Sequence, residues 1–326
     1  MRYIDEFRTI LLYFPSLINL FRKNPYSLQY NLVLNIGQRN RKNMKKFLLA
    51  GILIPSLLNA QRLHLNLFGG FSNYSGDLQS KAFTMDQSFA AFGGGLQYDL
   101  TDHFSILGNL TDAKVGASDV YNKPELKPRN LSFQTKIYEA NIVGEYTLFD
   151  LSQKRFSPYL FAGLALYHFN PYTFDTSGHK VYLQPLSTEG EGLPQYPGQK
   201  PYKLTQLAIP FGAGIKLRIS DNVVLAYEIG LRKLFTDYLD DVSTMYVDPA
   251  ILLAAKGPKA VELAYRGNEI KGGNPNYPPV GAKRGSPKYY DWYYLSVIKI
   301  CIGINSMGTS YGRGPRGSLD CPKKVI

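Results

Sequence analysis

Long hydrophobic runs are missing from this chain of 326 residues. No apolar stretch reaches the roughly 18 residues that a membrane-spanning helix needs, which excludes a helical membrane protein. Cysteine is scarce as well. Cys301 and Cys321 are too few for a disulfide framework, and they lack the Cys/His spacing of zinc or iron–sulfur sites. We therefore predict no metal and no cofactor. We expect free thiols; the alternative is a Cys301–Cys321 disulfide in the oxidising periplasm, which requires the tail to fold back to the strand end.

Histidine is also sparse, and its positions do not indicate catalysis. No nearby Ser or Cys completes a nucleophile–base pair with any of the four, which are His64, His103, His168 and His179. The sequence therefore predicts no catalytic residues. We expect a protein that is not an enzyme.

Basic residues are in excess, but they do not gather as they do in a nucleic-acid-binding protein. The formal charge of the whole chain is +12. From Gln61 onward, 28 basic residues stand against 23 acidic ones, and the basic residues are spread between hydrophobic segments. Because nucleic-acid recognition needs a concentrated basic patch, we predict no nucleic-acid partner.

Residues 44–60 are predicted to form a secretory signal peptide. Met44-Lys45-Lys46 supplies the short basic region, Phe47 to Leu58 the apolar core, and Ala60 the small residue before cleavage. The charged region of a signal peptide is only a few residues long, so we interpret residues 1–43 as a non-native upstream extension, with Met44 as the start. A genuine cytoplasmic or membrane-dipping extension is the alternative.

Aromatic residues are abundant, with 25 Tyr and 18 Phe, and they favour strands. From Gln61 onward we find eight segments of alternating character, mostly of roughly the length that a tilted strand needs to cross an outer membrane. In the seventh segment, for example, Leu225 and Tyr227 share one face, and Ala226 and Glu228 share the other. The segments are Arg62 to Asn73, Phe89 to Leu100, Phe104 to Val115, Leu131 to Leu148, Ser157 to Phe169, Leu204 to Arg218, Val223 to Phe235, and Trp292 to Asn305.

The lengths of the connections between these segments distinguish two possible all-β folds. A soluble sandwich packed on one face would also show this alternation. Short connections alternate with long ones, however, as periplasmic turns alternate with extracellular loops in outer-membrane barrels. The sequence therefore predicts an all-β fold in which residues 61–305 form an eight-stranded antiparallel transmembrane β-barrel in the bacterial outer membrane. Both chain ends are expected in the periplasm, with residues 306–326 as a periplasmic tail.

Several charged residues fall on the inward face of the predicted strands. The lumen of an eight-stranded barrel is just filled by side chains, and unpaired charge there is costly. We therefore predict a plug of ion pairs in place of a conduction path. Its members are Glu139, Glu145, Lys216, Arg218, Glu228, Arg232 and Lys299.

The last long connection, residues 236–291, divides by charge. Asp237, Asp240, Asp241 and Asp248 come first, but their spacing lacks the ligand order of an EF-hand calcium loop, so we expect a solvated acidic turn. A basic stretch follows, which we interpret as a solvated face or as a contact for lipopolysaccharide phosphates or an acidic partner. It comprises Lys256, Lys259, Arg266, Lys271, Lys283, Arg284 and Lys288.

Three motifs resemble the PorG-type outer-membrane barrels of type IX secretion. They are Phe68 to Leu78, Ser157 to Gly163 and, most specifically, Arg232 to Thr244, which contains Thr-Asp-Tyr-Leu-Asp-Asp-Val-Ser-Thr. The resemblance covers most of residues 61–305. It implies a non-enzymatic secretion component in the outer membrane whose periplasmic face associates with a ring of PorK and PorN proteins.

On this resemblance, we expect the ring to dock on the tail from Ser306 and on the turns Thr101 to His103 and Ile219 to Asn222. The motif loop would lie at the opposite rim, with its aspartates bonding loop backbone. It contains Thr236, Asp237, Tyr238, Asp240 and Asp241. The alternative is a stand-alone surface barrel whose long loops bind an external ligand or shield the envelope.

Overall fold

The computed structural model describes residues 62–79, 84 and 86–304. Eight antiparallel strands in this range close into a barrel, because each pairs with the next and β10 pairs again with β1. The predicted all-β, eight-stranded fold is confirmed. The barrel strands are β1 (Leu63–Ser75), β2 (Phe89–Asp99), β3 (Phe104–Ser118), β4 (Ser132–Thr147), β5 (Phe156–Phe169), β8 (Thr205–Ser220), β9 (Val223–Leu234) and β10 (Trp292–Gly303).

The two faces of the barrel wall differ in polarity. Outward-facing Ile142 and Leu164 are each 67% exposed, whereas inward-facing Asn66, Glu145 and Lys216 are buried. A protein in water would not expose a continuous belt of large apolar side chains while burying charged ones. This inverted pattern arises because successive residues of a strand point to opposite faces, one toward lipid and one toward the lumen.

Three short connections lie at one end of the barrel, which we call the short-turn end. Only Asp221 and Asn222 separate β8 from β9. The Thr101 hydroxyl accepts a hydrogen bond of 2.9 Å from the Phe104 amide, and Asp150 Oδ1 accepts one of 2.7 Å from the Ser152 amide. Side chains that satisfy their own backbone in this way stabilise tight turns. The start of β1 and the end of β10 lie at this same end, because His64 pairs with Gly303.

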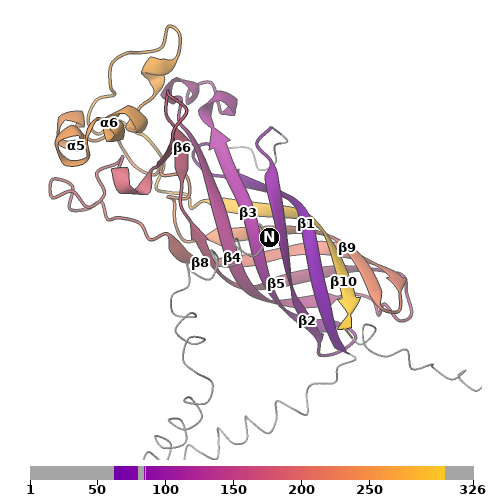
Figure 1. Cartoon of the computed structure of the whole chain (residues 1–326). Coiled ribbons are helices and arrows are strands. Elements are labelled where there is room, and N and C mark those ends of the chain that lie inside the picture. The colour runs from indigo at the N-terminus through magenta and orange to yellow at the C-terminus, as the bar shows by residue number, and fades with distance from the viewer. Residues whose placement is uncertain (1–61, 80–83, 85, 305–326) are drawn as a thin grey trace, which may run out of the picture. The chain divides into compact units, whose positions relative to one another are not determined.

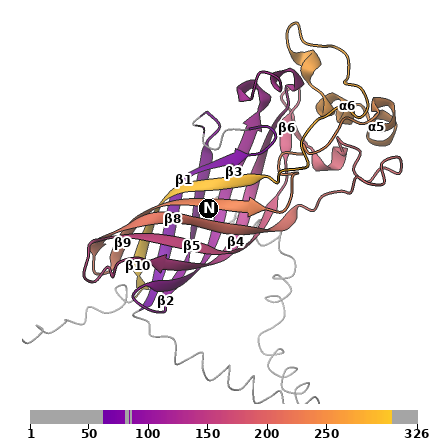
Figure 2. The ribbon, with the colours of Figure 1, turned by 180° about the vertical axis from the view of Figure 1, so that it is seen from behind.

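The opposite, long-loop end carries a folded cap, which we define as residues 170–204 and 235–291. Both views place α5, α6 and β6 at this end (Figures 1 and 2). The cap elements are β6 (Tyr172–Phe174), β7 (Lys180–Tyr182), η4 (Gln184–Leu186), α5 (Pro249–Lys256), α6 (Pro258–Ala264) and η5 (Gly267–Glu269), and the β3–β4 loop adds η2 (Asp119–Tyr121) and η3 (Lys127–Arg129). None of the helices in the described ranges is long and apolar enough to cross a membrane.

Local sequence explains the two α-helices of the cap. Asp248 caps α5 by accepting a hydrogen bond of 2.8 Å from the Ala250 amide, and Pro249 occupies the first turn. Gly257, with a φ of 84°, ends α5, and Pro258 begins α6. The helices pack on loop residues through a small apolar cluster. A larger core extends from the lumen at the long-loop end into the base of the cap.

Candidate functional site

The lumen holds three buried ion pairs among the described residues. Each joins a basic side chain of one strand to a carboxylate of another, and all six side chains are less than a tenth exposed. They belong to the predicted plug. The pairs are Arg232 with Glu139, at 3.2 Å, Lys216 with Glu145, and Lys299 with Glu228.

Neutral donors and acceptors complete these pairs. Glu139 also accepts hydrogen bonds from Asn141 Nδ2, at 2.6 Å, and from the Tyr293 hydroxyl. The Tyr159 hydroxyl donates to Glu228 at 2.8 Å, and Lys216 donates to the Thr147 hydroxyl at 3.1 Å. A buried ion pair is tolerated only when its remaining hydrogen-bonding capacity is met in this way.

The space left between these side chains is small. The cavity at the level of the Arg232 and Lys299 pairs has a volume of about 10 Å³. A single water needs at least that much room. The packing at this level is therefore suited to holding the barrel wall rigid.

Arg218 does not join the plug, so that part of the sequence prediction is wrong. Its guanidinium donates a hydrogen bond of 3.1 Å to the Ser152 carbonyl in an exposed position at the short-turn end. The register of β8 and β9 shifts between Arg218 and Ser220. At the rim, water solvates the charge, so no buried carboxylate is required.

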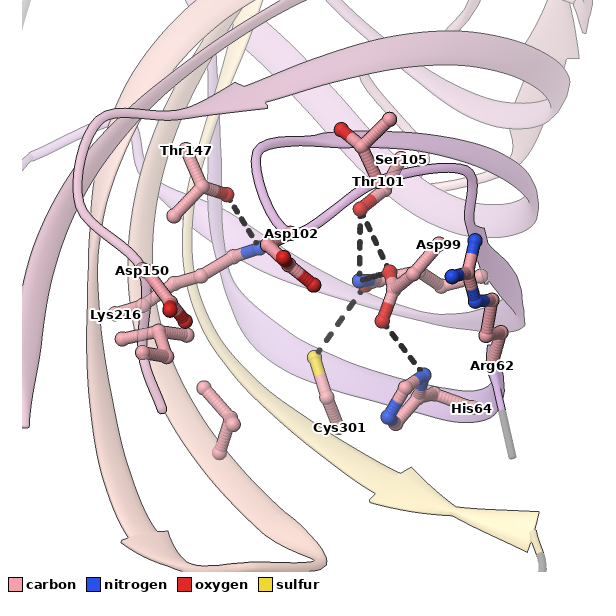
Figure 3. Close-up of a pocket in the computed structure, with 13 residues that line it drawn as sticks. Arg62, His64, Asp99, Thr101, Asp102, Ser105, Thr147, Asp150, Lys216 and Cys301 are labelled. Atoms are coloured by element: carbon pink, nitrogen blue, oxygen red, sulfur yellow. Dashed lines mark hydrogen bonds and ion pairs between the residues drawn. The ribbon is translucent and has the colours of Figure 1, made fainter. Parts of the chain in front are cut away.

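A polar pocket of about 270 Å³ opens at the short-turn end (Figure 3). Thr101 and Asp102 of the first predicted docking turn line it, together with Asp150 of the next turn. His64 Nδ1 lies 3.3 Å from Asp99 Oδ2 inside it. The pocket therefore presents carboxylates at the mouth of the barrel. The second predicted turn reaches this end too, and Asn222 accepts a hydrogen bond of 2.9 Å from the Gly303 amide.

Cys301 lines the same pocket with a buried thiol, and no disulfide involves it within the described residues. Its sulfur lies 4.0 Å from Gln97 Oε1. Cys321 and the predicted docking tail from Ser306 lie outside the described residues, as do residues 1–43 and the predicted signal peptide 44–60.

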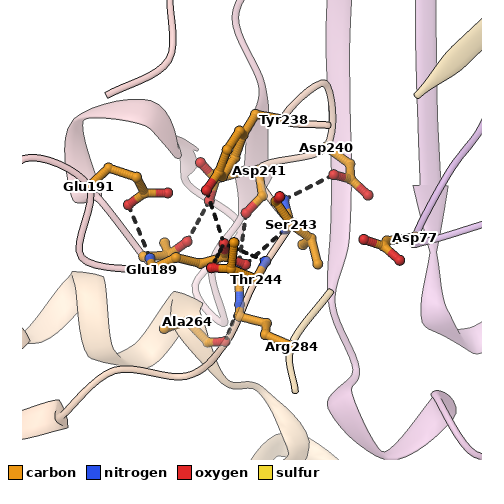
Figure 4. A network of polar contacts seen from close by, with 12 residues as sticks. Asp77, Glu189, Glu191, Tyr238, Asp240, Asp241, Ser243, Thr244, Ala264 and Arg284 are labelled. Carbon is orange, nitrogen blue, oxygen red and sulfur yellow. Dashed lines mark hydrogen bonds and ion pairs between the residues drawn. The ribbon is translucent and has the colours of Figure 1, made fainter. Parts of the chain in front are cut away.

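The base of the cap is organised by Glu189 and Arg284 (Figure 4). Their side chains lie 2.9 Å apart and are almost fully buried. Glu189 also accepts hydrogen bonds from the amides of Ser243 and Thr244 at 2.9 and 2.8 Å. Burial acts to lower the pKa of Arg284, but Glu189 and then Asp241 outweigh it, so the pKa stands above its ordinary value. Arg284 is thus a fixed cation, and the expectation of a solvated basic face is wrong for it.

The motif loop enters this network from β9. Asp241 accepts hydrogen bonds from the hydroxyls of Thr188, at 2.7 Å, and Tyr202, at 2.6 Å. Tyr238 stacks on Tyr202 with ring centroids 4.9 Å apart, and the Thr236 hydroxyl accepts a hydrogen bond of 3.2 Å from the Tyr238 amide. The motif therefore joins the two halves of the cap.

Tyr74 connects the barrel wall to the motif loop through two carboxyl groups. Its hydroxyl oxygen lies 2.6 Å from Asp240 Oδ2 and 2.9 Å from Asp291 Oδ1, and all three residues are buried. A hydroxyl has one proton, so it can donate to only one of these oxygens. The other carboxyl group must carry a proton of its own. Burial, followed by repulsion from Asp291, raises the pKa of Asp240, and burial raises that of Asp291 to about 8.

The acidic turn is buried, contrary to the prediction of a solvated one. Asp240 and Asp241 are fully buried, and Asp237 Oδ2 is enclosed with no hydrogen-bond partner among the described residues. Burial, with repulsion from Asp291, raises the pKa of Asp237 to about 9. Backbone bonding by the aspartates is only part of the arrangement: Asp240 accepts a hydrogen bond of 2.9 Å from the Val242 amide, whereas Asp241 binds hydroxyl groups.

Sequence reasoning missed Glu189 and Asp291 and placed Arg284 on a solvated face, because their partners are distant in the chain. Glu189 and Arg284 are 95 residues apart. One local signal was present. Gly190 and Gly192 flank Glu191 directly after Glu189, and such closely spaced glycines are typical of a tight turn; their φ angles are 82° and 77°. Within the described ranges, no group of three or more His, Cys, Asp or Glu side chains is placed to hold a metal ion.

A closed barrel with a lipid-facing apolar belt and a lumen plugged by paired charges defines an integral outer-membrane β-barrel protein. Comparison with protein families agrees. Residues 48–248 match the family described as "Outer membrane protein beta-barrel domain". This chain belongs to that family.

Several solved structures resemble the chain. Neisserial surface protein A is 11% identical, with a TM-score of 0.37 over 74% of this chain and 96% of that one. OprG from Pseudomonas aeruginosa is 9% identical, with a TM-score of 0.36 over 74% and 97% of the two chains. Ail from Yersinia pestis is 9% identical, with a TM-score of 0.35 over 74% and 97%. No curated protein matches the sequence.

Proposed function

We propose that this protein is a non-enzymatic, non-conducting outer-membrane anchor of a type IX protein secretion machinery. In this role the long-loop end faces outward, and the short-turn end, with both chain termini, faces the periplasm. There it holds a ring of PorK- and PorN-type proteins.

The plugged lumen is the observation that carries the proposal. Three ion pairs lie in the lumen, and the cavity at the level of the Arg232 and Lys299 pairs measures about 10 Å³, whereas Lys216 lines the larger pocket at the short-turn end. A porin or solute channel would need an open lumen, whereas an anchor needs a rigid wall. The motif Arg232 to Thr244 supports the secretion assignment through its resemblance to the PorG-type barrels, and in the structure its end is bonded into the base of the cap.

The short-turn end supplies a surface for the ring. Its pocket is open to solvent, and Asp102 and Asp150 stand at its edge on two different turns. Charges of both signs are exposed there, because Arg62 lines the same pocket and Lys154 and Arg155 lie in the same turn as Asp150. A partner whose charged side chains match this mixed pattern would be complementary to it.

Site-specific cross-linking in intact envelopes tests the proposal. A photo-reactive residue at Asp102 or Asp221, on the short turns, should capture ring proteins. The matched control is the same residue at Tyr289, which is 66% exposed in the long loop and should capture none. If ring proteins are not recovered at the short turns, and a deletion strain still secretes normally, the secretion role is wrong and a stand-alone surface barrel is supported.

A further inference from the structure

Three lysines gather on the outside of the barrel at its long-loop end. Lys114 of β3 and Lys136 of β4 are direct cross-strand partners. Their neighbours Ala113 and Thr135 are buried inward, so by strand alternation both lysines face outward. Like charges directly opposite each other destabilise a sheet unless something else binds them.

The third lysine comes from the cap. Lys180 begins β7, which pairs with β6. β6 in turn pairs with β4, where Tyr172 lies opposite Gln134, two residues from Lys136. Lys180 Nζ lies over the ring of Tyr172, whose hydroxyl donates a hydrogen bond of 3.2 Å to Gln134 Oε1. This contact places the Lys180 ammonium group beside β4, on the face that carries Lys136 and its cross-strand partner Lys114.

Among the described residues these lysines form no ion pair like those of the lumen lysines, although Asp112 of β3 shares the outward face two residues from Lys114. Across residues 62–79, 84 and 86–304, no ion pair includes Lys114, Lys136 or Lys180. Aromatic rings hold two of them instead. Lys114 Nζ lies 4.8 Å from the centroid of the Phe89 ring, and Lys180 Nζ lies 3.8 Å from that of Tyr172. Such contacts position a cation without neutralising it.

The patch lies just beyond the lipid-facing belt. On the same outward faces, Leu110 is 55% and Ile142 is 67% exposed. Lys114 follows Leu110 by four positions, which on a strand tilted by about 45° is roughly 10 Å along the membrane normal. The lysines therefore stand at the depth of lipid headgroups, where aromatic residues such as Tyr172 are also favoured.

We propose that Lys114, Lys136 and Lys180 form a binding site for the phosphate groups of a phosphorylated glycolipid headgroup in the outer leaflet of the membrane. Ammonium groups and phosphate make charge-assisted hydrogen bonds, and three cations can surround one or two phosphates. The choice of leaflet rests on the proposed orientation of the barrel, whereas anion binding by the patch does not.

Lipid binding to the purified, refolded barrel tests this site. The variant is K114Q/K136Q/K180Q, and the control is K123Q/K127Q/K271Q, which removes the same charge from exposed long-loop lysines. The probes are lipid A with two phosphates, the same lipid after dephosphorylation, and phosphatidylglycerol. Native mass spectrometry counts the lipids retained, and heat-modified electrophoretic migration checks that each variant is folded.

We expect the first variant to bind phosphorylated lipid A about tenfold more weakly, with the difference shrinking at high salt, and the control to remain within about twofold of the wild type. Dephosphorylation should weaken binding to the wild type as much as the triple substitution does. Equal binding of lipid A by wild type and variant would overturn the site. Tighter binding of phosphatidylglycerol than of lipid A would overturn the glycolipid assignment. Neither result bears on capture of ring proteins, which tests the proposed function separately.

Discussion

Removing the cation from the best-enclosed lumen pair, by Arg232→Met, should destabilise the barrel severely. Arg232 is 3% exposed, and its Nε lies 3.2 Å from Glu139 Oε2. Methionine fills similar space but leaves a buried carboxylate with only Asn141 and Tyr293 as neutral donors. Breaking one side of a buried ion pair costs about 3–5 kcal/mol. This is a large fraction of the roughly 5–15 kcal/mol that stabilises most folded proteins.

A double-mutant cycle separates the pair from its surroundings. Glu139→Gln should cost a similar amount because it leaves Arg232 unpaired. The double variant should be markedly less destabilised than the sum of the two, with a coupling energy of about 2 kcal/mol or more. The matched control is Lys233→Met on the same strand, whose side chain is exposed and should change stability by no more than about 0.5 kcal/mol.

The assay is urea-induced unfolding of the protein in lipid vesicles, followed by tryptophan fluorescence and electrophoretic migration. The single Trp292 begins β10, one residue before Tyr293, so its emission reports on the wall beside the Glu139 pair. A loss below about 1 kcal/mol for Arg232→Met, or a double variant as unstable as the sum of the singles, would refute the account of the lumen as a set of coupled ion pairs.

Three further outcomes test the cap and the lumen. Gly76→Ala would place a methyl group 1.9 Å from Asp291 Oδ1 and 2.0 Å from the Tyr74 hydroxyl, so it should destabilise the cap by about 1–3 kcal/mol; unchanged amide exchange in residues 236–244 would contradict this. The pKa values of about 9 for Asp237 and about 8 for Asp291 exceed the roughly 3.9 of unfolded aspartate, so the folded cap holds extra protons. Their stabilising contribution is complete below about pH 4 and decreases as pH rises through 8 and 9. After correction for the intrinsic effect of pH on exchange rates, amide exchange of residues 236–244 should therefore be faster at pH 9 than at pH 6. The increase should be smaller in Asp237→Asn. Equal corrected rates at both pH values in the wild type would count against the buried protons. Finally, the plugged lumen predicts no stepwise conductance in planar bilayers, and regular channel openings by the wild type would show that the lumen is not sealed.

The strands were predictable because their signal is local. Alternation of residues such as Tyr227 and Glu228 follows from strand geometry alone, whatever the partner strand. The inward direction of Glu139, Lys216 and Arg232 follows from the same alternation. Which carboxylate meets which cation depends on the register of neighbouring strands, and that register is set by the closed barrel as a whole. Arg218 has the same inward parity and yet remains solvated at the rim.

The burial of the acidic residues in the cap was not predicted, because it depends on contacts that are not local in sequence. Asp237, Asp240 and Asp241 are charged residues in a long loop, which in sequence indicates exposure to water. Their burial requires Tyr74, Asp291 and Arg284, which come from distant parts of the chain.

The sequence by itself determined that this chain forms eight membrane-length strands, each with a lipid-facing apolar face and a face that carries charged residues. This was possible because two-residue periodicity is a property of neighbouring residues in the chain. The tertiary structure alone decided which lumen charges form the three ion pairs between strands. It also decided that the acidic loop is buried around shared protons, and that three lysines lie together on the outer face of the barrel. Each of these depends on contacts between segments far apart in the chain, which only the closed barrel brings within a few ångströms of one another.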